Sequence, residues 1–130
     1  MAVKIIDYGM GNLQSIRRAC EECGASVMIT DNPLDLGDAD HIILPGVGAF
    51  ADAMRNLQQK DWLGAINRAA QKGVPFLGIC LGMQLLASKG FEGGETDGLN
   101  LIPGEVRVLR PPDTDLRIPH VGWNEIKSLQ

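Results

Sequence analysis

The segment of residues 75–84 constrains the fold of this chain more than any other. A short apolar run ends in Gly78, Cys80 and Gly82 at alternate positions, and a helical pattern follows at once. This glycine–nucleophile–glycine spacing is typical of a strand that turns sharply into a helix, with cysteine in the place of serine. The glycines remove Cβ atoms that would clash in such a turn. We therefore expect Cys80 at the start of a helix, where backbone N–H groups favour a thiolate.

The rest of the chain alternates between strand and helix patterns. Strands are expected at 3–6, 25–30, 41–44 and 74–79, and helices at 13–23, 50–57, 62–72 (capped by Asp61) and 80–88. This alternation predicts an α/β fold with a parallel sheet. After Gly90 the pattern changes, and stretches near 106–108 and 125–127, with a turn at 111–113 between them, predict antiparallel strands added after about residue 100.

Length and charge narrow the class of protein. The 130 residues are expected to form one domain, 1–130. A net charge of −4 argues against nucleic acid as a partner, and no apolar run approaches the roughly 20 residues of a membrane span. A strand pattern begins at Val3, so no signal peptide is expected. Three cysteines, an odd number, then indicate reduced thiols and a cytoplasmic location.

Three of the expected strands end in glycine-rich loops, at 7–12, 45–48 and 78–82. The carboxyl ends of parallel strands share one edge of a sheet, where ligands bind. A thiolate there attacks a carbonyl carbon to form a thioester, and the developing oxyanion needs fixed donors. The N–H of Leu81 is one candidate and the 45–48 loop offers another. The alternative for that loop is a plain strand-to-helix turn.

The general base is the missing part. Acyl transfer by cysteine normally uses a histidine, and the chain has only His41 and His120. His41 begins a strand, so we expect it at the end of the sheet opposite Cys80. His120 lies in a turn-rich segment, where a surface or interface role is the simpler interpretation.

Two further patterns have structural interpretations. Cys20 and Cys23 form a CxxC that closes a helix instead of opening one, and no second pair completes a zinc site. Because both thiols fall on an apolar stripe, we expect them in the core. Gly9 and Gly11 lack the third glycine of a dinucleotide-binding loop. No metal and no cofactor are expected.

Five blocks, at 7–12, 44–50, 78–84, 101–104 and 119–124, resemble the class I (triad) glutamine amidotransferases, in that family's order. Within the family, the chain is most similar to the glutaminase subunits of imidazole glycerol phosphate synthases. The first and last blocks are the most specific to these subunits. The resemblance implies a flavodoxin-like three-layer sandwich with a mostly parallel central sheet.

The resemblance also implies roles for single residues. Cys80 would attack the side-chain amide of glutamine, with Val47, Gly48 and Leu81 as the oxyanion region. Gly46, Gly48, Gln84 and Glu92 would bind glutamine. Asn12, His120 and Trp123 would face the partner, a (β/α)8 cyclase that receives the ammonia and makes imidazole glycerol phosphate and an aminoimidazole carboxamide ribotide in histidine biosynthesis.

One family feature does not occur in the sequence. The family's catalytic histidine and glutamate lie in a His-Pro-Glu segment beyond the last block, and the 130 residues contain no such segment. We therefore expect an N-terminal portion of the subunit, with little or no glutaminase turnover by this chain alone. The alternatives are an amidotransferase of another pathway, a non-catalytic partner-binding domain, or a redox or metal role of Cys20 and Cys23.

Overall fold

A computed structural model describes residues 1–110, 112, 115 and 117–128. Its elements in chain order are β1 (Ala2–Ile6), α1 (Leu13–Glu22), β2 (Ser26–Thr30), the 3-10 helix η1 (Pro33–Asp38), β3 (His41–Leu44), α2 (Phe50–Gln59), α3 (Trp62–Gln71), β4 (Phe76–Gly78), α4 (Leu81–Leu85), β5 (Ala87–Gly90), β6 (Thr96–Asp97) and β7 (Ile102–Val106). Within the described part of the chain, every helix is too short or too polar to cross a membrane.

The central sheet has four parallel strands in the order β2-β1-β3-β4. Ile5 pairs with Ile29 on one side and with Ile43 on the other, and Leu44 pairs with Gly78. Each parallel pair needs a crossover, and the helices supply them. The predicted α/β fold with a mostly parallel sheet is therefore confirmed.

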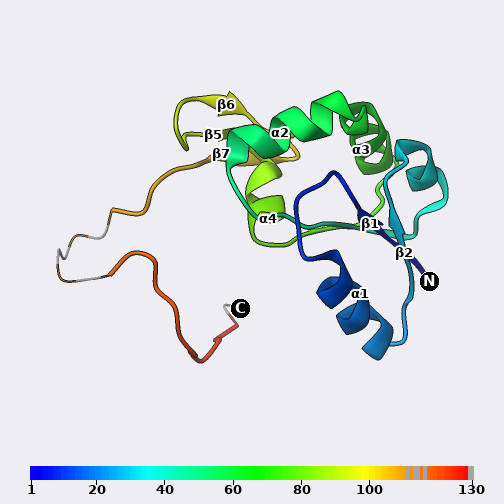
Figure 1. The fold of residues 1–130 in the computed structure, drawn as a ribbon, viewed down its shortest axis with the longest axis horizontal. Coiled ribbons are helices and arrows are strands. Elements are labelled where there is room, and N and C mark those ends of the chain that lie inside the picture. Colours follow the sequence, from blue (N-terminus) through cyan, green and yellow to red (C-terminus); the bar gives the residue numbers. More distant parts are fainter. Residues whose placement is uncertain (111, 113–114, 116, 129–130) are drawn as a thin grey trace.

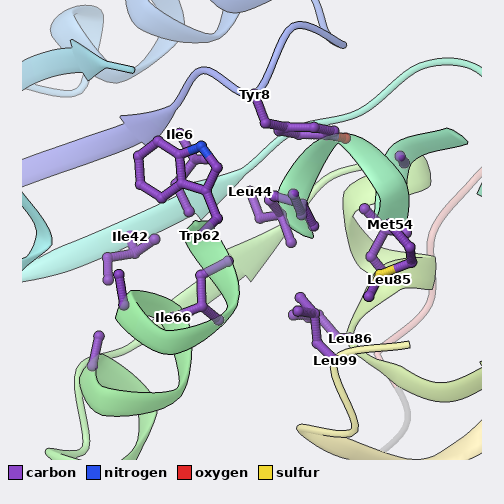
Figure 2. Close-up of a cluster of buried hydrophobic side chains, with 14 of the residues drawn as sticks. Ile6, Tyr8, Ile42, Leu44, Met54, Trp62, Ile66, Leu85, Leu86 and Leu99 are labelled. Atoms are coloured by element: carbon purple, nitrogen blue, oxygen red, sulfur yellow. The ribbon is translucent and has the colours of Figure 1, made fainter. Parts of the chain in front are cut away.

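Helices cover both faces of this sheet, giving three layers (Figure 1). Side chains alternate along each strand, so in β3 Ile42 and Leu44 face α2 and α3 whereas Ile43 faces α1. The first face holds the main core, in which Tyr8 and Trp62 are fully buried (Figure 2). The second face is thinner: its fully enclosed residues are Val3, Ile5 and Ile43.

A second, smaller sheet has the order β6-β5-β7. β5 pairs antiparallel with β6 and parallel with β7. The expectation of antiparallel strands after about residue 100 is therefore wrong in two respects. The antiparallel pair forms earlier, at β5 and β6, and β7 returns on the other side of β5, which makes that pair parallel.

The helix after Cys80 is shorter than predicted. α4 ends at Leu85, and β5 occupies part of the stretch expected to be helical. The cause is a non-local segment: Gly98 N donates to Ser88 O at 2.8 Å, and Leu99 N donates to Leu85 O at 2.8 Å. Carbonyl groups that would continue the helix are thus used by another part of the chain.

Two other expectations need correction. Asp61 precedes α3 with a left-handed φ of 60° and makes no capping hydrogen bond through its side chain. Among residues 107–110, 112, 115 and 117–128 no strand forms, so the strand expected at 125–127 is absent. Residues 111 and 113 of the expected turn lie outside the described residues.

Candidate active site

Cys80 lies in the turn of residues 78–82 between β4 and α4, and its thiol is exposed. Its backbone has φ 54° and ψ −118°, a conformation that costs a residue with a Cβ roughly 1–3 kcal/mol. The two glycines are required by close approach: a Cβ on Gly82 would overlap the Leu44 carbonyl oxygen, and one on Gly78 would lie 2.5 Å from Met83 Cα. The turn therefore has the sharp geometry that the glycine spacing predicts.

The loop of residues 45–48 packs directly against this turn. A Cβ on Gly46 would lie 2.8 Å from Gly82 N and 2.9 Å from Leu81 Cβ. Val47 is 62% exposed, and Gly48 has a left-handed φ of 117°. Among the described residues, the N–H groups of Val47 and Gly48 donate no hydrogen bond. These N–H groups are thus available to a bound group.

A cleft of about 250 Å³ lies next to this loop. It brings together Gly48, Gln84 and Glu92, three of the residues predicted to bind substrate, whereas Gly46 is not among its lining residues. One oxygen of Glu92, Oε2, accepts a hydrogen bond from Phe50 N at 3.0 Å, at the start of α2. Glu92 therefore also ties the segment after β5 to the end of the 45–48 loop.

The structure adds Arg107 to the lining of the cleft. Its guanidinium lies 4.0 Å from the centroid of the Phe91 ring and 2.7 Å from a carboxylate oxygen of Glu105. Sequence reasoning missed Arg107 because no spacing relates it to the 78–82 turn. Only the pairing of β7 with β5 brings it there.

Tyr8 is the second residue that sequence reasoning missed. Its ring is fully buried, and its hydroxyl donates to Pro45 O at 2.9 Å. Burial, and then the charge of Cys80, raise the pKa of Tyr8 to about 12. An aromatic hydroxyl immediately after a buried strand, at the sheet edge that carries the glycine-rich loops, was the available signal.

Neither histidine of the chain has geometry that marks it as the base. His41 is the first residue of β3, and β3 runs parallel to β4, so His41 lies at the opposite end of the sheet from Cys80. His120 Nε2 lies 2.6 Å from Asn124 Nδ2. Its segment lies apart from the helices and sheets of the body (Figure 1).

The residues predicted to face a partner are all exposed. Asn12 caps α1, and its side-chain oxygen accepts from Ser15 N at 3.4 Å. His120 and Trp123 lie in the segment of residues 117–128, and Trp123 is fully exposed. Their role in an interface stays a prediction.

The core placement of the CxxC pair is wrong for one cysteine. Cys23 is exposed and Cys20 is half-buried, and both thiols are free. The physical reason is that Cys23 is the C-cap just past the end of α1, and that no residue of α1 itself is buried.

The family model for class-I glutamine amidotransferases matches residues 4–124. The chain therefore belongs to the class I glutamine amidotransferase family. Two curated relatives are each named imidazole glycerol phosphate synthase subunit HisH. The one from Moorella thermoacetica is 53% identical over 96% of this chain and 58% of its own length. The one from Methanosarcina barkeri is 49% identical over 98% of this chain and 61% of its own length. The chain thus spans about three-fifths of the length of these relatives.

Solved structures support the fold. One glutamine amidotransferase structure superposes with a TM-score of 0.60 at 17% identity, over 68% of this chain and 46% of that one. A putative peptidase E from Listeria monocytogenes superposes with a TM-score of 0.65 at 16% identity, over 78% of this chain and 62% of that one. At these identities the likeness is one of architecture alone.

Proposed function

We propose that this chain carries the nucleophile and the glutamine cleft of an imidazole glycerol phosphate synthase glutaminase. The observation that carries the proposal is the contact between two glycine-rich segments: the strained turn with the exposed Cys80, and the 45–48 loop packed against it. The cleft with Gln84 and Glu92 adjoins this loop. The relatives named as HisH subunits support the choice of enzyme.

The proposed chemistry is acyl transfer from glutamine. The Cys80 thiolate attacks the side-chain amide carbon, and the carbonyl oxygen becomes an oxyanion facing the N–H groups of Val47, Gly48 and Leu81. Collapse of this intermediate breaks the carbon–nitrogen bond and leaves a glutamyl thioester. The nitrogen takes a proton and leaves as ammonia, and water then hydrolyses the thioester to glutamate.

Glutamine would bind in the cleft through polar groups at its two ends. Gln84 and Glu92 line the cleft, and amide and carboxylate oxygens suit the donors of an amino acid. The backbone of Gly46 and Gly48 approaches without side chains, and this leaves room for substrate beside Cys80. These roles follow the resemblance to the family.

The partner in this proposal is the (β/α)8 cyclase subunit of imidazole glycerol phosphate synthase. Ammonia would pass to it unprotonated, and Asn12, His120 and Trp123 would contribute to the contact. The complete exposure of Trp123 supports this assignment, because aromatic residues are enriched at protein interfaces. A location in the cytoplasm accords with such a biosynthetic role.

Labelling of Cys80 by a diazoketone analogue of glutamine tests the proposal. In a Cys20→Ser, Cys23→Ser variant, we expect one label per chain by intact mass, with glutamine slowing the reaction. The matched Cys80→Ala variant should take up no label. Turnover of glutamine by the purified 130-residue chain should be negligible, because the sequence contains no His-Pro-Glu segment.

Other outcomes would favour the alternatives. A chain that binds the cyclase but whose Cys80 is never labelled in the complex would indicate a non-catalytic binding domain. A Cys80 that is labelled, in a chain that does not co-purify with the (β/α)8 cyclase, would point to an amidotransferase of another pathway. Rapid turnover by the isolated chain would contradict the role assigned to the absent base.

A further inference from the structure

We propose that Tyr8 is a positioning residue: its hydroxyl holds the Pro45 carbonyl and so sets the 45–48 loop against the turn that carries Cys80. The inference rests on the proposed function, because the loop matters most if an oxyanion forms beside it. Tyr8 itself would touch no substrate. It would act through the backbone of Pro45 and Gly46.

The hydrogen bond is well placed for this role. Tyr8 Oη donates to Pro45 O at 2.9 Å, and both residues are fully buried. In Figure 2 the Tyr8 hydroxyl lies on the side of the ring away from Trp62. A buried carbonyl that loses its donor pays a desolvation penalty that is not returned. The bond therefore resists reorientation of the Pro45–Gly46 peptide.

Close contacts carry this restraint to the candidate active site. A Cβ on Gly46 would lie 2.6 Å from Tyr8 Oη on one side and 2.8 Å from Gly82 N on the other. Gly46 is thus held between the Tyr8 hydroxyl and the 78–82 turn. A shift of this peptide would move the N–H groups that follow it, at Val47 and Gly48, relative to Cys80.

The neighbours of Tyr8 in the 7–12 loop pack on the same segment. A Cβ on Gly48 would lie 2.6 Å from Met10 Cε, and one on Gly11 would lie 3.1 Å from Pro45 Cβ. These contacts are non-directional, whereas the Tyr8 hydrogen bond has a direction. The hydroxyl therefore sets the orientation of a peptide that packing alone would leave adjustable.

The protonation state of Tyr8 suits a permanent donor. Burial, with a contribution from the charge of Cys80, raises its pKa to about 12. The hydroxyl thus stays protonated across the ordinary pH range.

The test compares the 130-residue chain with its Tyr8→Phe variant, which keeps the ring and removes the hydroxyl. We expect the amide ¹H–¹⁵N signals of Val47 and Gly48 to shift or broaden, because their loop loses the restraint on the Pro45–Gly46 peptide. We also expect about 5- to 10-fold weaker binding of the aldehyde analogue of glutamine, whose adduct with Cys80 places an oxygen in the oxyanion region. Alkylation of Cys80 by iodoacetamide, which forms no oxyanion, should change less than about twofold.

Trp62→Phe is the matched control, because it alters a buried aromatic residue of the same core away from the loop. It should lower stability and leave the Val47 and Gly48 amide signals unchanged. It should also leave the aldehyde affinity, compared with the iodoacetamide rate, unchanged. Unchanged loop signals and equal aldehyde affinity in Tyr8→Phe would overturn the inference, as would the same changes in Trp62→Phe. If the aldehyde fails to bind wild type, the proposed function is contradicted, and the loop signals alone decide the role of Tyr8.

Discussion

The two faces of the central sheet differ in how completely their helices are buried. α1 and α2 have ten residues each and both carry apolar residues at helical spacing. α2 buries four residues, Phe50, Ala53, Met54 and Leu57, whereas α1 buries none. On the α1 side, an apolar groove of about 430 Å³ runs between the helix and the β4 edge, where Leu77 is 56% exposed. An amphipathic pattern therefore predicts a helix and the face it turns inward, but not how deeply that face is buried.

Truncating one isoleucine on each face of the sheet should give the largest difference in the free energy of unfolding. Ile66 in α3 is completely buried in the main core, so Ile66→Ala should lower the free energy of unfolding by about 3–4 kcal/mol. Ile16 in α1 is only partly buried, so Ile16→Ala should cost about 1 kcal/mol. Urea unfolding measures both. Equal losses would show that the α1 face is packed as tightly as the other.

Alkaline pH should destabilise the main core through Tyr8, the single tyrosine of the chain. Below pH 10 this side chain is protonated in folded and unfolded chains alike, so its full contribution to stability is present. Because the pKa of Tyr8 is raised from 10.0 to about 12 in the folded chain, the unfolded chain ionises first. The free energy of unfolding then falls as pH rises from 10 to 12, by up to roughly 2–3 kcal/mol.

Urea unfolding of wild type and Tyr8→Phe between pH 9 and 12 measures this contribution. Other groups titrate in the same range, but they cancel in the difference between the two chains. Tyrosinate absorbance reports the ionisation directly. Parallel stability curves, or ionisation near pH 10 in the folded chain, would contradict the burial assigned to this hydroxyl.

Removing the capping side chains of α2 and α1 should change the free energy of unfolding by smaller and unequal amounts. At α2 the Glu92 carboxylate accepts from Phe50 N across 42 residues of chain, so Glu92→Ala should cost about 1 kcal/mol. At α1 the Asn12 oxygen lies 3.4 Å from Ser15 N on an exposed surface, so Asn12→Ala should cost about 0.5 kcal/mol or less. Thermal unfolding measures both. Glu92→Gln keeps an acceptor and should stay near wild type; a loss equal to that of Glu92→Ala would contradict the capping role.

The smallest effect should be a difference in the alkylation rates of Cys20 and Cys23. It is measured in a Cys80→Ala background. Burial, and then the charges of Cys23 and Glu21, raise the pKa of Cys20. Cys23 is exposed, so iodoacetamide should label it roughly 3- to 10-fold faster than Cys20 at pH 8. Peptide mapping over time gives the two rates. Faster labelling of Cys20 would indicate that the α1 face opens readily.

Local patterns predicted the features that depend on local chemistry. The bounds of β3 were predicted without error, because a short apolar run lies between polar and proline–glycine segments. The turn at Cys80 was predicted because only glycine fits where Gly78 meets Met83 and Gly82 meets Leu44. His41 was placed at the far end of the sheet because parallel strands share one direction.

The features that local patterns missed depend on partners distant in the sequence. The end of α4 at Leu85 is set by Gly98 and Leu99, whose N–H groups take the carbonyls a longer helix would use. The parallel pairing of β7 with β5 follows from the placement of β6 on the other edge. Arg107 reaches the cleft only through that pairing.

The sequence by itself therefore determined the parallel α/β sheet, the glycine-rich loops at its carboxyl edge and the cysteine in a strained turn. Each of these depends on short-range sterics and on side-chain periodicity. The tertiary structure alone decided how deeply each helix is buried, where α4 stops, and that the Tyr8 hydroxyl meets the Pro45 carbonyl. Those outcomes depend on contacts between segments far apart in the chain, which bury a helix face or take a backbone hydrogen bond that a local structure would otherwise use.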